Sequence, residues 1–373
     1  MQFIDLHKQF ERIEDGVREG FDAVFKHKGF IGGPEIKELE STLAEYTGVK
    51  NVIACASGTD ALTVPLKAWD LKESDAVFVP SFTFFASAES ITLAGGTPVF
   101  VDVDYETFNM NPNDLEIKIQ ETLKEEKLTP RGIIAVDLFG LPADFPAIRT
   151  IAEKYGLFLL EDAAQGFGGT LNGRQAGSFG DVGATSFFPA KPLGCYGDGG
   201  AIFTDDDEMA FLIDSIHIHG KGTDKYDNVR IGYNSRLDTF QAVVLLNKMK
   251  LFDEELDKRN FVAAEYTKRL KDTFETPIVP EGYSSSWAQY TLKAKDKEER
   301  DLIVDKMKEQ GIPVMVYYPI PIHKSGAYKH LNAKNLSVTD DLSNKVFSLP
   351  MHPYLEVEEI EMICNALKSI VNR

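Results

Sequence analysis

The sequence predicts an α/β protein, with a mostly parallel sheet in a large domain and a smaller α+β domain at the C-terminal end. Three observations support this prediction. Nearly all-apolar runs of strand length alternate with helical segments, as in parallel sheets that helices cover on both faces. An unusually long helical pattern follows at residues 235–271. Beyond residue 285, strands and helices follow in an order that is typical of a separate, small α+β domain.

The first 50 residues predict two helices separated by a glycine turn. The second helix has Pro34 near its start, apolar residues at Ile36, Leu39 and Leu43, and Gly48 after its end. Proline in a first turn and glycine beyond a last turn are ordinary start and stop signals of a helix.

The segment that follows predicts the sheet. Its expected strands are short apolar runs at residues 51–57, 75–81, 97–104, 131–140 and 157–164. The helices expected between them lie at 58–70, 85–96, 112–126 and 144–156. In the C-terminal part we expect strands at 286–294 and 312–318 and helices at 297–311 and 356–373.

Composition excludes several classes of function. The formal net charge of -18 argues against nucleic acid and anionic membranes as partners, because both need a basic face. The cysteines Cys55, Cys195 and Cys364 have no spacing typical of a zinc site or a disulfide framework, so no metal is expected. No apolar run approaches ~18 residues and the N-terminus has no signal-peptide pattern, so we expect a cytoplasmic protein.

Two loops that follow predicted strands have residues suited to a ligand. Ligands of parallel α/β sheets lie beyond the carboxyl ends of the strands. Gly58 and Thr59 open a helix after the first strand, where free N–H groups and the helix dipole attract an anion; the alternative is a plain helix cap. Phe84 follows the second strand and could stack on a planar ring, although core packing is the alternative for an isolated aromatic residue.

Asp162 and Lys191 suggest covalent chemistry. Asp162 follows an apolar strand directly, where a carboxylate is costly unless a cation pairs with it or it caps a helix. Lys191 lies among Phe, Pro, Ala and Gly residues, and desolvation there would lower its pKa and make the amine nucleophilic; the alternative is a surface lysine. Together with the anion site and the aromatic residue, this pair predicts a pyridoxal phosphate (PLP) site.

The chain resembles the DegT/StrS family of sugar aminotransferases, which are PLP enzymes. The resemblance spans nearly the whole chain and includes the motifs "FIDLHKQ", "GPEIKELE", "SGTDAL", "PSFTFFASAE", "EDAAQGFGG", "SFFPAKPLGCYGDGGAI", "GYNSRLDTFQA", "QYT", "YYPIP" and "SLPMHPYL". It implies the aspartate aminotransferase fold (fold type I), with a seven-stranded sheet. The large PLP-binding domain would include residues 1–250, and a small C-terminal domain would include residues 251–373.

The resemblance also implies roles for residues around the cofactor ring. Lys191 would form the Schiff base with pyridoxal 5′-phosphate and later move a proton. Asp162 would bind the pyridinium nitrogen N1, Gln165 would lie near O3′, and Phe84 would stack on the ring.

Further residues are expected to hold the cofactor phosphate. The resemblance gives this role to Gly58, Thr59 and Ser186 of one subunit. Asn234 would reach the phosphate of the neighbouring subunit, so the resemblance implies a homodimer with shared active sites.

The substrate implied by the resemblance is a nucleotide-linked keto-sugar, with glutamate as the amino donor. The subgroup most similar in motif aminates C3 of UDP-2-acetamido-2-deoxy-3-oxo-glucuronate for bacterial O-antigen. Arg236 is expected to bind a carboxylate, with a structural salt bridge as the alternative. Tyr317, Tyr318 and His323 are expected near the sugar, although Tyr317 stands where that subgroup has histidine. His219 and His352 are further candidates for polar contacts.

Other functions stay open at this stage. The enzyme could aminate another keto- or aldehyde-sugar, such as a 4-keto-6-deoxy UDP- or dTDP-sugar or a sugar acid. A sugar dehydratase of the same fold would have histidine in place of Lys191, so the lysine argues against it. A non-catalytic regulatory protein of this fold is the alternative from another class.

Overall fold

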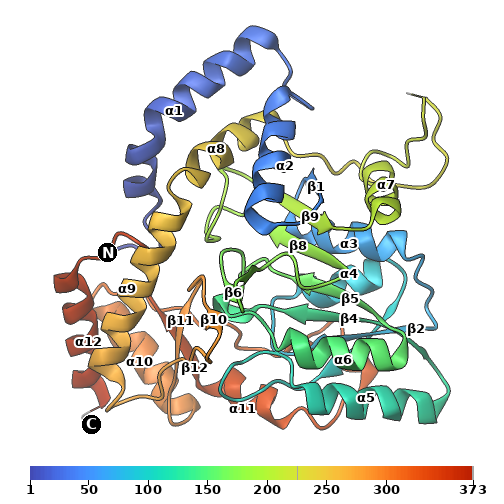
Figure 1. Ribbon diagram of the computed structural model, residues 1–373. Coiled ribbons are helices and arrows are strands. Elements are labelled where there is room, and N and C mark those ends of the chain that lie inside the picture. The colour runs from blue at the N-terminus through green and yellow to red at the C-terminus, as the bar shows by residue number, and fades with distance from the viewer. Residues whose placement is uncertain (225, 372–373) are drawn as a thin grey trace.

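A seven-stranded sheet forms the centre of the large part of the molecule (Figure 1). The computed structural model describes residues 1–224 and 226–371. The strand order is β1-β9-β8-β5-β4-β2-β3, and β9 is the strand that runs opposite to the others. The mostly parallel α/β sheet is therefore confirmed. The strands are β1 (Asn51–Cys55), β2 (Asp75–Pro80), β3 (Thr97–Val101), β4 (Thr129–Val136), β5 (Phe158–Asp162), β8 (Val182–Ser186) and β9 (Gly200–Thr204).

Helices cover both faces of this sheet because its strands are apolar on both sides. In β2, Val77 and Val79 belong to a core shared with α3 (Gly58–Ala68), α4 (Ala86–Leu93) and α7 (Asp207–Ile216). Ala76 and Phe78 point to the other face, as alternate strand residues must. They pack with α5 (Pro112–Glu125) and α6 (Phe145–Tyr155), which lie along the lower front of Figure 1.

The N-terminal segment forms the two predicted helices. α1 (Leu6–His27) extends away from the sheet and packs along α8 (Thr239–Met249) (Figure 1). α2 (Pro34–Thr47) begins at its proline and ends at Gly48, whose φ of 73° is left-handed. Among the described residues, no helix is both long and apolar enough to cross a membrane.

The prediction of one long helix at 235–271 is wrong. The segment forms α8 and α9 (Phe252–Leu270), with a turn at Lys250 and Leu251 between them. The Leu251 N–H bonds to the carbonyl oxygen of Lys248 at 2.9 Å, three residues back, so the α-helical ladder is interrupted there. The apolar pattern continues through the turn, so the sequence gives no sign that the helix is interrupted there.

The C-terminal part has a hydrophobic core of its own, built around Tyr266, Tyr290 and Phe347. Its elements are β11 (Tyr290–Lys293), β12 (Val346–Leu349), α10 (Lys297–Glu309), α11 (Ser337–Lys345) and α12 (Val357–Val371). Short elements connect it to the rest: β6 (Thr170–Leu171), β7 (Arg174–Gln175), β10 (Tyr283–Ser284), η1 (Leu138–Gly140), η2 (Ile322–Lys324) and η3 (Lys329–Leu331). A domain boundary after residue 250 stays a prediction.

The strand predicted at residues 312–318 is wrong. Only Met315 of this segment pairs, through an isolated bridge to Ser348. Pro313 has no N–H to donate, so the segment cannot extend the ladder of β12. It instead carries Tyr317 and Tyr318 past the end of the large sheet.

Candidate functional site

Asp162 is a buried carboxylate at the carboxyl end of β5, a central strand. It is 5% exposed. The Ser87 hydroxyl, on the first turn of α4, donates to Asp162 Oδ2 at 2.7 Å, and the Ala164 N–H donates to Oδ1 at 3.2 Å. Burial raises the pKa of Asp162, while these hydrogen bonds and the positive charge of Lys191 lower it. The carboxylate is thus held in one orientation, ready to pair with a cation.

Lys191 lies in the loop after β8, within electrostatic range of Asp162. Its backbone N–H donates to the Phe188 carbonyl oxygen at 2.9 Å, so the loop folds into a tight turn. Burial lowers the pKa of Lys191, and the charge of Asp162 raises it. Within the described part of the chain, no hydrogen bond or ion pair engages the lysine Nζ. A half-buried, unpartnered amine of lowered pKa is suited to attack a carbonyl carbon.

An anion site lies at the N-terminus of α3. The Ser57 side chain caps this helix by accepting the Asp60 N–H at 3.1 Å, so the expected helix cap is present. The N–H groups of Gly58 and Thr59, in the first turn, remain available to an anion. A Cβ on Gly58 would lie 2.5 Å from the Cβ of Ser186, so only glycine lets the helix approach that serine. The Ser186 hydroxyl therefore lies beside the helix N-terminus, where a phosphate would bind.

Gln165 is hydrogen-bonded to two aromatic residues at the same edge of the sheet. It is buried, its Oε1 accepts the Phe139 N–H at 2.8 Å, and its Nε2 donates to the Tyr318 hydroxyl at 3.0 Å. The rings of Tyr318 and Phe84 have centroids 6.3 Å apart. Phe84 is 54% exposed, so its ring is open to a partner rather than packed in the core. The structure thus brings Gln165, Tyr318 and Phe84 together, and their roles toward a cofactor or sugar stay predictions.

The family comparison identifies this arrangement. The sequence profile of the DegT/DnrJ/EryC1/StrS aminotransferase family matches residues 12–368. The chain belongs to this family. Two curated relatives are a UDP-2-acetamido-2-deoxy-3-oxo-D-glucuronate aminotransferase from Pseudomonas aeruginosa and a pleiotropic regulatory protein from Geobacillus stearothermophilus. The first is 45% identical over 98% of this chain and 99% of its own; the second is 39% identical over 96% and 95%.

Solved structures of the family share the whole fold. A DegT/DnrJ/EryC1/StrS aminotransferase from Brucella abortus is 48% identical, with a TM-score of 0.98 over 100% of both chains. The NtdA protein of Bacillus subtilis, crystallised with bound cofactor PMP, is 29% identical, with a TM-score of 0.89 over 100% of this chain and 83% of its own. The predicted fold and family are therefore confirmed.

Three further predicted residues of this aminotransferase are Tyr317, Arg236 and Asn234. Tyr317 packs on Tyr318, with ring centroids 5.8 Å apart. Arg236 is half-buried, and no acidic side chain in the described ranges forms an ion pair with it, which argues against the structural salt bridge. Asn234 is exposed and forms a bridge with Ile218, and its role toward a second subunit stays a prediction.

The histidines are engaged in structural contacts or lie exposed. His323 is buried, and its Nδ1 is 2.7 Å from the Ser81 hydroxyl while its Nε2 is 3.3 Å from Asp340 Oδ1. Both ring nitrogens are occupied, which favours a structural role over the expected substrate contact. His352 is buried in the C-terminal part, and its Nδ1 accepts the Tyr354 N–H at 3.3 Å. His219 is exposed.

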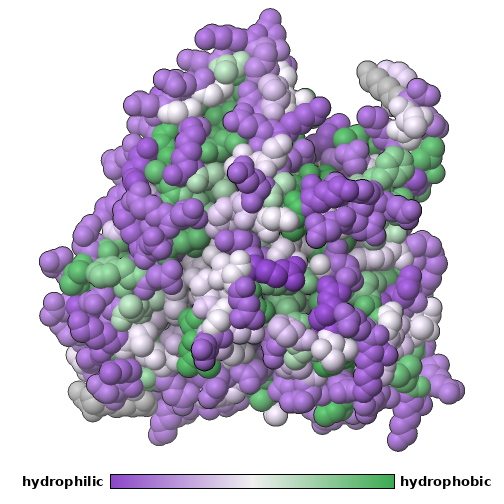
Figure 2. Space-filling view, viewed as in Figure 1, coloured by the Kyte–Doolittle hydropathy of each residue, from purple (hydrophilic) through white to green (hydrophobic). Residues whose placement is uncertain are grey.

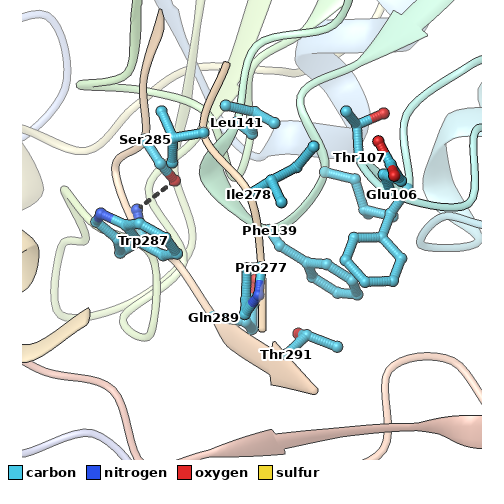
Figure 3. A pocket seen from close by; sticks show the side chains of 13 residues that line it. Glu106, Thr107, Phe139, Leu141, Pro277, Ile278, Ser285, Trp287, Gln289 and Thr291 are labelled. Carbon is cyan, nitrogen blue, oxygen red and sulfur yellow. Dashed lines mark hydrogen bonds between the residues drawn. The ribbon is translucent and has the colours of Figure 1, made fainter. Parts of the chain in front are cut away.

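A small cavity lies behind Phe139, between the large sheet and the C-terminal part (Figure 3). Its volume is about 20 Å³, and Ile278, Trp287 and Gln289 line it with Phe139. Such a volume holds about one water molecule. The cavity is therefore a small packing void beside the site, and it is too small for a substrate.

Sequence reasoning missed Ser87 and two acids beneath the site, Asp137 and Glu161. Ser87 lies within the quoted motif "PSFTFFASAE", and its place in the first turn of a helix after a strand was a usable signal. Asp137 and Glu161 are both 0% exposed. A charged residue in an apolar strand, as in "FLLED", was the available signal for Glu161.

Proposed function

We propose that the chain is a PLP-dependent aminotransferase that moves an amino group from glutamate to a nucleotide-linked keto-sugar. The observation that supports this most strongly is the unpartnered amine of Lys191 within electrostatic range of the buried carboxylate of Asp162. An amine and an acid that act on each other in one site suit the two ends of a pyridine aldehyde, and the anion site at α3 suits its phosphate.

The residues present fit this cofactor. Lys191 would hold it covalently, Asp162 would pair with its ring nitrogen, and Gln165 and Phe84 would contact its ring. Gly58, Thr59 and Ser186 would bind its phosphate through N–H groups and hydroxyls, which explains how an acidic chain accepts an anion. When bound, the cofactor supplies an electron sink for a carbanion next to nitrogen.

The chain's own residues would then perform the proton transfers. Lys191 would remove a proton from the substrate carbon and return one to the cofactor carbon. Asp162 would keep the ring nitrogen protonated, because the Ser87 hydroxyl holds the carboxylate in the ionised form that pairs with a cation. Tyr318, fixed by Gln165, would close one side of the site.

The preferred acceptor is the 3-oxo group of UDP-2-acetamido-2-deoxy-3-oxo-glucuronate, for bacterial O-antigen or another surface polysaccharide. The Pseudomonas aeruginosa relative bears that substrate in its name. Arg236, free of an ion-pair partner in the described ranges, would bind the carboxylate of the uronate or of glutamate. A cytoplasmic location follows from such a substrate and stays a prediction.

We further propose that the active form is a homodimer. Large apolar side chains are exposed near the end of α1 and in the loop before Asn234: Phe25, Phe30, Ile31, Val229 and Ile231, of which Ile231 is 83% exposed. Figure 2 shows apolar surface between α1 and α8 among other apolar patches on this face. A second copy that covers these side chains would bring Asn234 to the partner's phosphate site.

A spectroscopic experiment tests the proposed function. The purified protein with PLP should show the absorption band of the lysine-bound cofactor, and glutamate should convert it to the pyridoxamine form. A panel of UDP- and dTDP-linked keto-sugars should then restore the first band, most rapidly with the 3-oxo-glucuronate. Binding of PLP without any change on adding glutamate would favour a dehydratase or a regulatory protein and refute the proposal.

A further inference from the structure

Two buried acids lie side by side next to Asp162. Asp137 follows β4 and Glu161 is the residue before Asp162 in β5. Glu161 pairs with Ala135 in the ladder between β4 and β5, so Asp137, two residues further on, lies on the same face beside it. Their charges act on each other, and both residues are 0% exposed. Two carboxylates side by side and out of water cannot both be ionised, so this pair must hold a proton.

The hydrogen-bond donors around the pair indicate which acid holds that proton. Glu161 accepts three backbone N–H groups: Gly177 at 2.5 Å on Oε1, and Phe179 at 2.6 Å and Gly180 at 3.3 Å on Oε2. Burial raises the pKa of Glu161 to about 7, and these three donors act against burial because they favour the ionised carboxylate. Asp137 accepts a single N–H, from Ala143 at 3.0 Å on Oδ1. Its Oδ2 is buried and accepts no hydrogen bond from a described residue.

The charges near Asp137 also indicate that Asp137 is the acid that holds the proton. They come from Glu161 and Asp162 on β5, and the Tyr283 hydroxyl of β10 lies within electrostatic range. Burial, followed by the charge of Glu161, raises the pKa of Asp137 well above its usual range. None of the groups that face it in the described ranges is a cation.

We propose that Asp137 is a neutral carboxylic acid whose Oδ2–H donates to Glu161, and that this acid–carboxylate pair positions Asp162 and Gln165. The proton satisfies the otherwise orphaned Oδ2, and the pair then has one negative charge instead of two. This inference rests on the proposed function, because it concerns residues that would contact the cofactor. Asp137 is a positioning residue that acts through its neighbours.

The backbone connections explain how the pair acts on the site. The Asp137 N–H donates to the carbonyl oxygen of Asp162 at 3.1 Å. The Asp137 side chain also packs against Gly166, where an added Cβ would lie 2.3 Å from the Asp137 Cβ. The turn that starts at Asp137 places the Phe139 N–H on Gln165. The segment that starts at Asp137 therefore contacts both Asp162 and Gln165, and the Asp137 side chain packs beside the residue after Gln165.

The conservative substitution Asp137→Asn tests the protonation state. Asparagine keeps the size and the donor to Glu161 but cannot titrate, so the cofactor site should keep its affinity for PLP within about threefold. Asp137→Ala removes the donor and should weaken PLP binding about ten- to hundredfold. Equal losses in both variants would contradict the proposal, because a merely structural role of the carboxylate predicts no rescue by the amide.

Infrared spectroscopy detects the carboxyl proton of Asp137 directly and needs no activity assay. The wild-type protein at pH 7 should show a protonated-carboxyl band that shifts with ¹³C-aspartate labelling and is lost in Asp137→Asn. Asp102→Asn is the matched control, because Asp102 is also buried but accepts the N–H groups of Val103, Val338 and Thr339. The band should persist in that control. A wild-type holoenzyme without an aspartate band would overturn the proposal, even if Asp137→Asn failed to fold.

The same readout separates the two proposals. If PLP failed to bind the wild-type protein, the proposed function would be refuted. The difference in the carboxyl band between the wild-type and Asp137→Asn apoproteins would still show whether Asp137 holds a proton. If PLP bound and the band were unchanged by Asp137→Asn, the function would stand and the assignment of the proton would fall.

Discussion

The hydrogen bond from Ser87 to Asp162 allows a quantitative test of the site. The substitution Ser87→Ala removes a 2.7 Å bond to a buried carboxylate and leaves its other bond, from Ala164, in place. A hydrogen bond to a charged group contributes about 1.5–3 kcal/mol. One pKa unit corresponds to about 1.4 kcal/mol, so the pKa of Asp162 should rise by about one to two units.

This rise should appear in both rate and pH dependence. A carboxylate that is harder to ionise pairs less well with the cofactor nitrogen, so kcat/KM for glutamate should fall about ten- to hundredfold. The acid limb of the kcat/KM profile should move to higher pH by about one to two units, because Asp162 must be ionised to act. Stopped-flow absorbance of the cofactor with glutamate measures both quantities.

Ser90→Ala is the matched control. Ser90 is equally buried in α4, and its hydroxyl donates to the Ser87 carbonyl oxygen at 3.2 Å without a hydrogen bond to Asp162. Its pH profile should match that of the wild type. If Ser87→Ala and Ser90→Ala gave the same profile and the same rate, the hydrogen bond would have no role in setting the state of Asp162.

Three other predictions concern the anion site, the substrate and stability. Gly58→Ala places a Cβ 2.5 Å from the Ser186 Cβ and should weaken PLP binding at least about tenfold, by fluorescence titration; unchanged affinity would contradict the anion site. Arg236→Ala should raise KM for the uronate sugar or for glutamate about tenfold or more with a smaller change in kcat, by steady-state assays with each substrate. Burial, and then the charge of Arg259, lowers the pKa of His352 to about 4 from 6.5, so its neutral form stabilises the fold above pH 6.5. About 3 kcal/mol should be lost as the pH falls from 6.5 to 4, and denaturant unfolding of His352→Gln should lack that loss.

The sequence predicted those features of the site that depend on residue type and order. The glycine-containing helix start follows β1, Asp162 ends β5 and Lys191 follows β8, and parallel topology brings such residues to one edge of a sheet. Ser87 escaped prediction because its role depends on the rotation of α4 against β5. The contact of His323 with Ser81 also escaped prediction, because Ser81 lies 242 residues away and no local pattern reveals a contact at that separation.

Local sequence patterns also gave wrong predictions where contacts distant in the sequence decide how the chain pairs or bends. Residues 312–318 are apolar and strand-like, yet they form one bridge, to Ser348. The helical periodicity of residues 235–271 continues through the turn at Leu251, whose tightened hydrogen bond to Lys248 separates α8 from α9. The acid pair of Asp137 and Glu161 depends on the contact between two strands, which the sequence does not specify.

The most direct test of the central claim is a peptide map of the holoenzyme after borohydride reduction in the presence of PLP. The reduced adduct should be found on the peptide containing Lys191, and Lys191→Ala should lose it together with all turnover. A cofactor mass attached to another lysine, or full turnover by Lys191→Ala, would contradict the account.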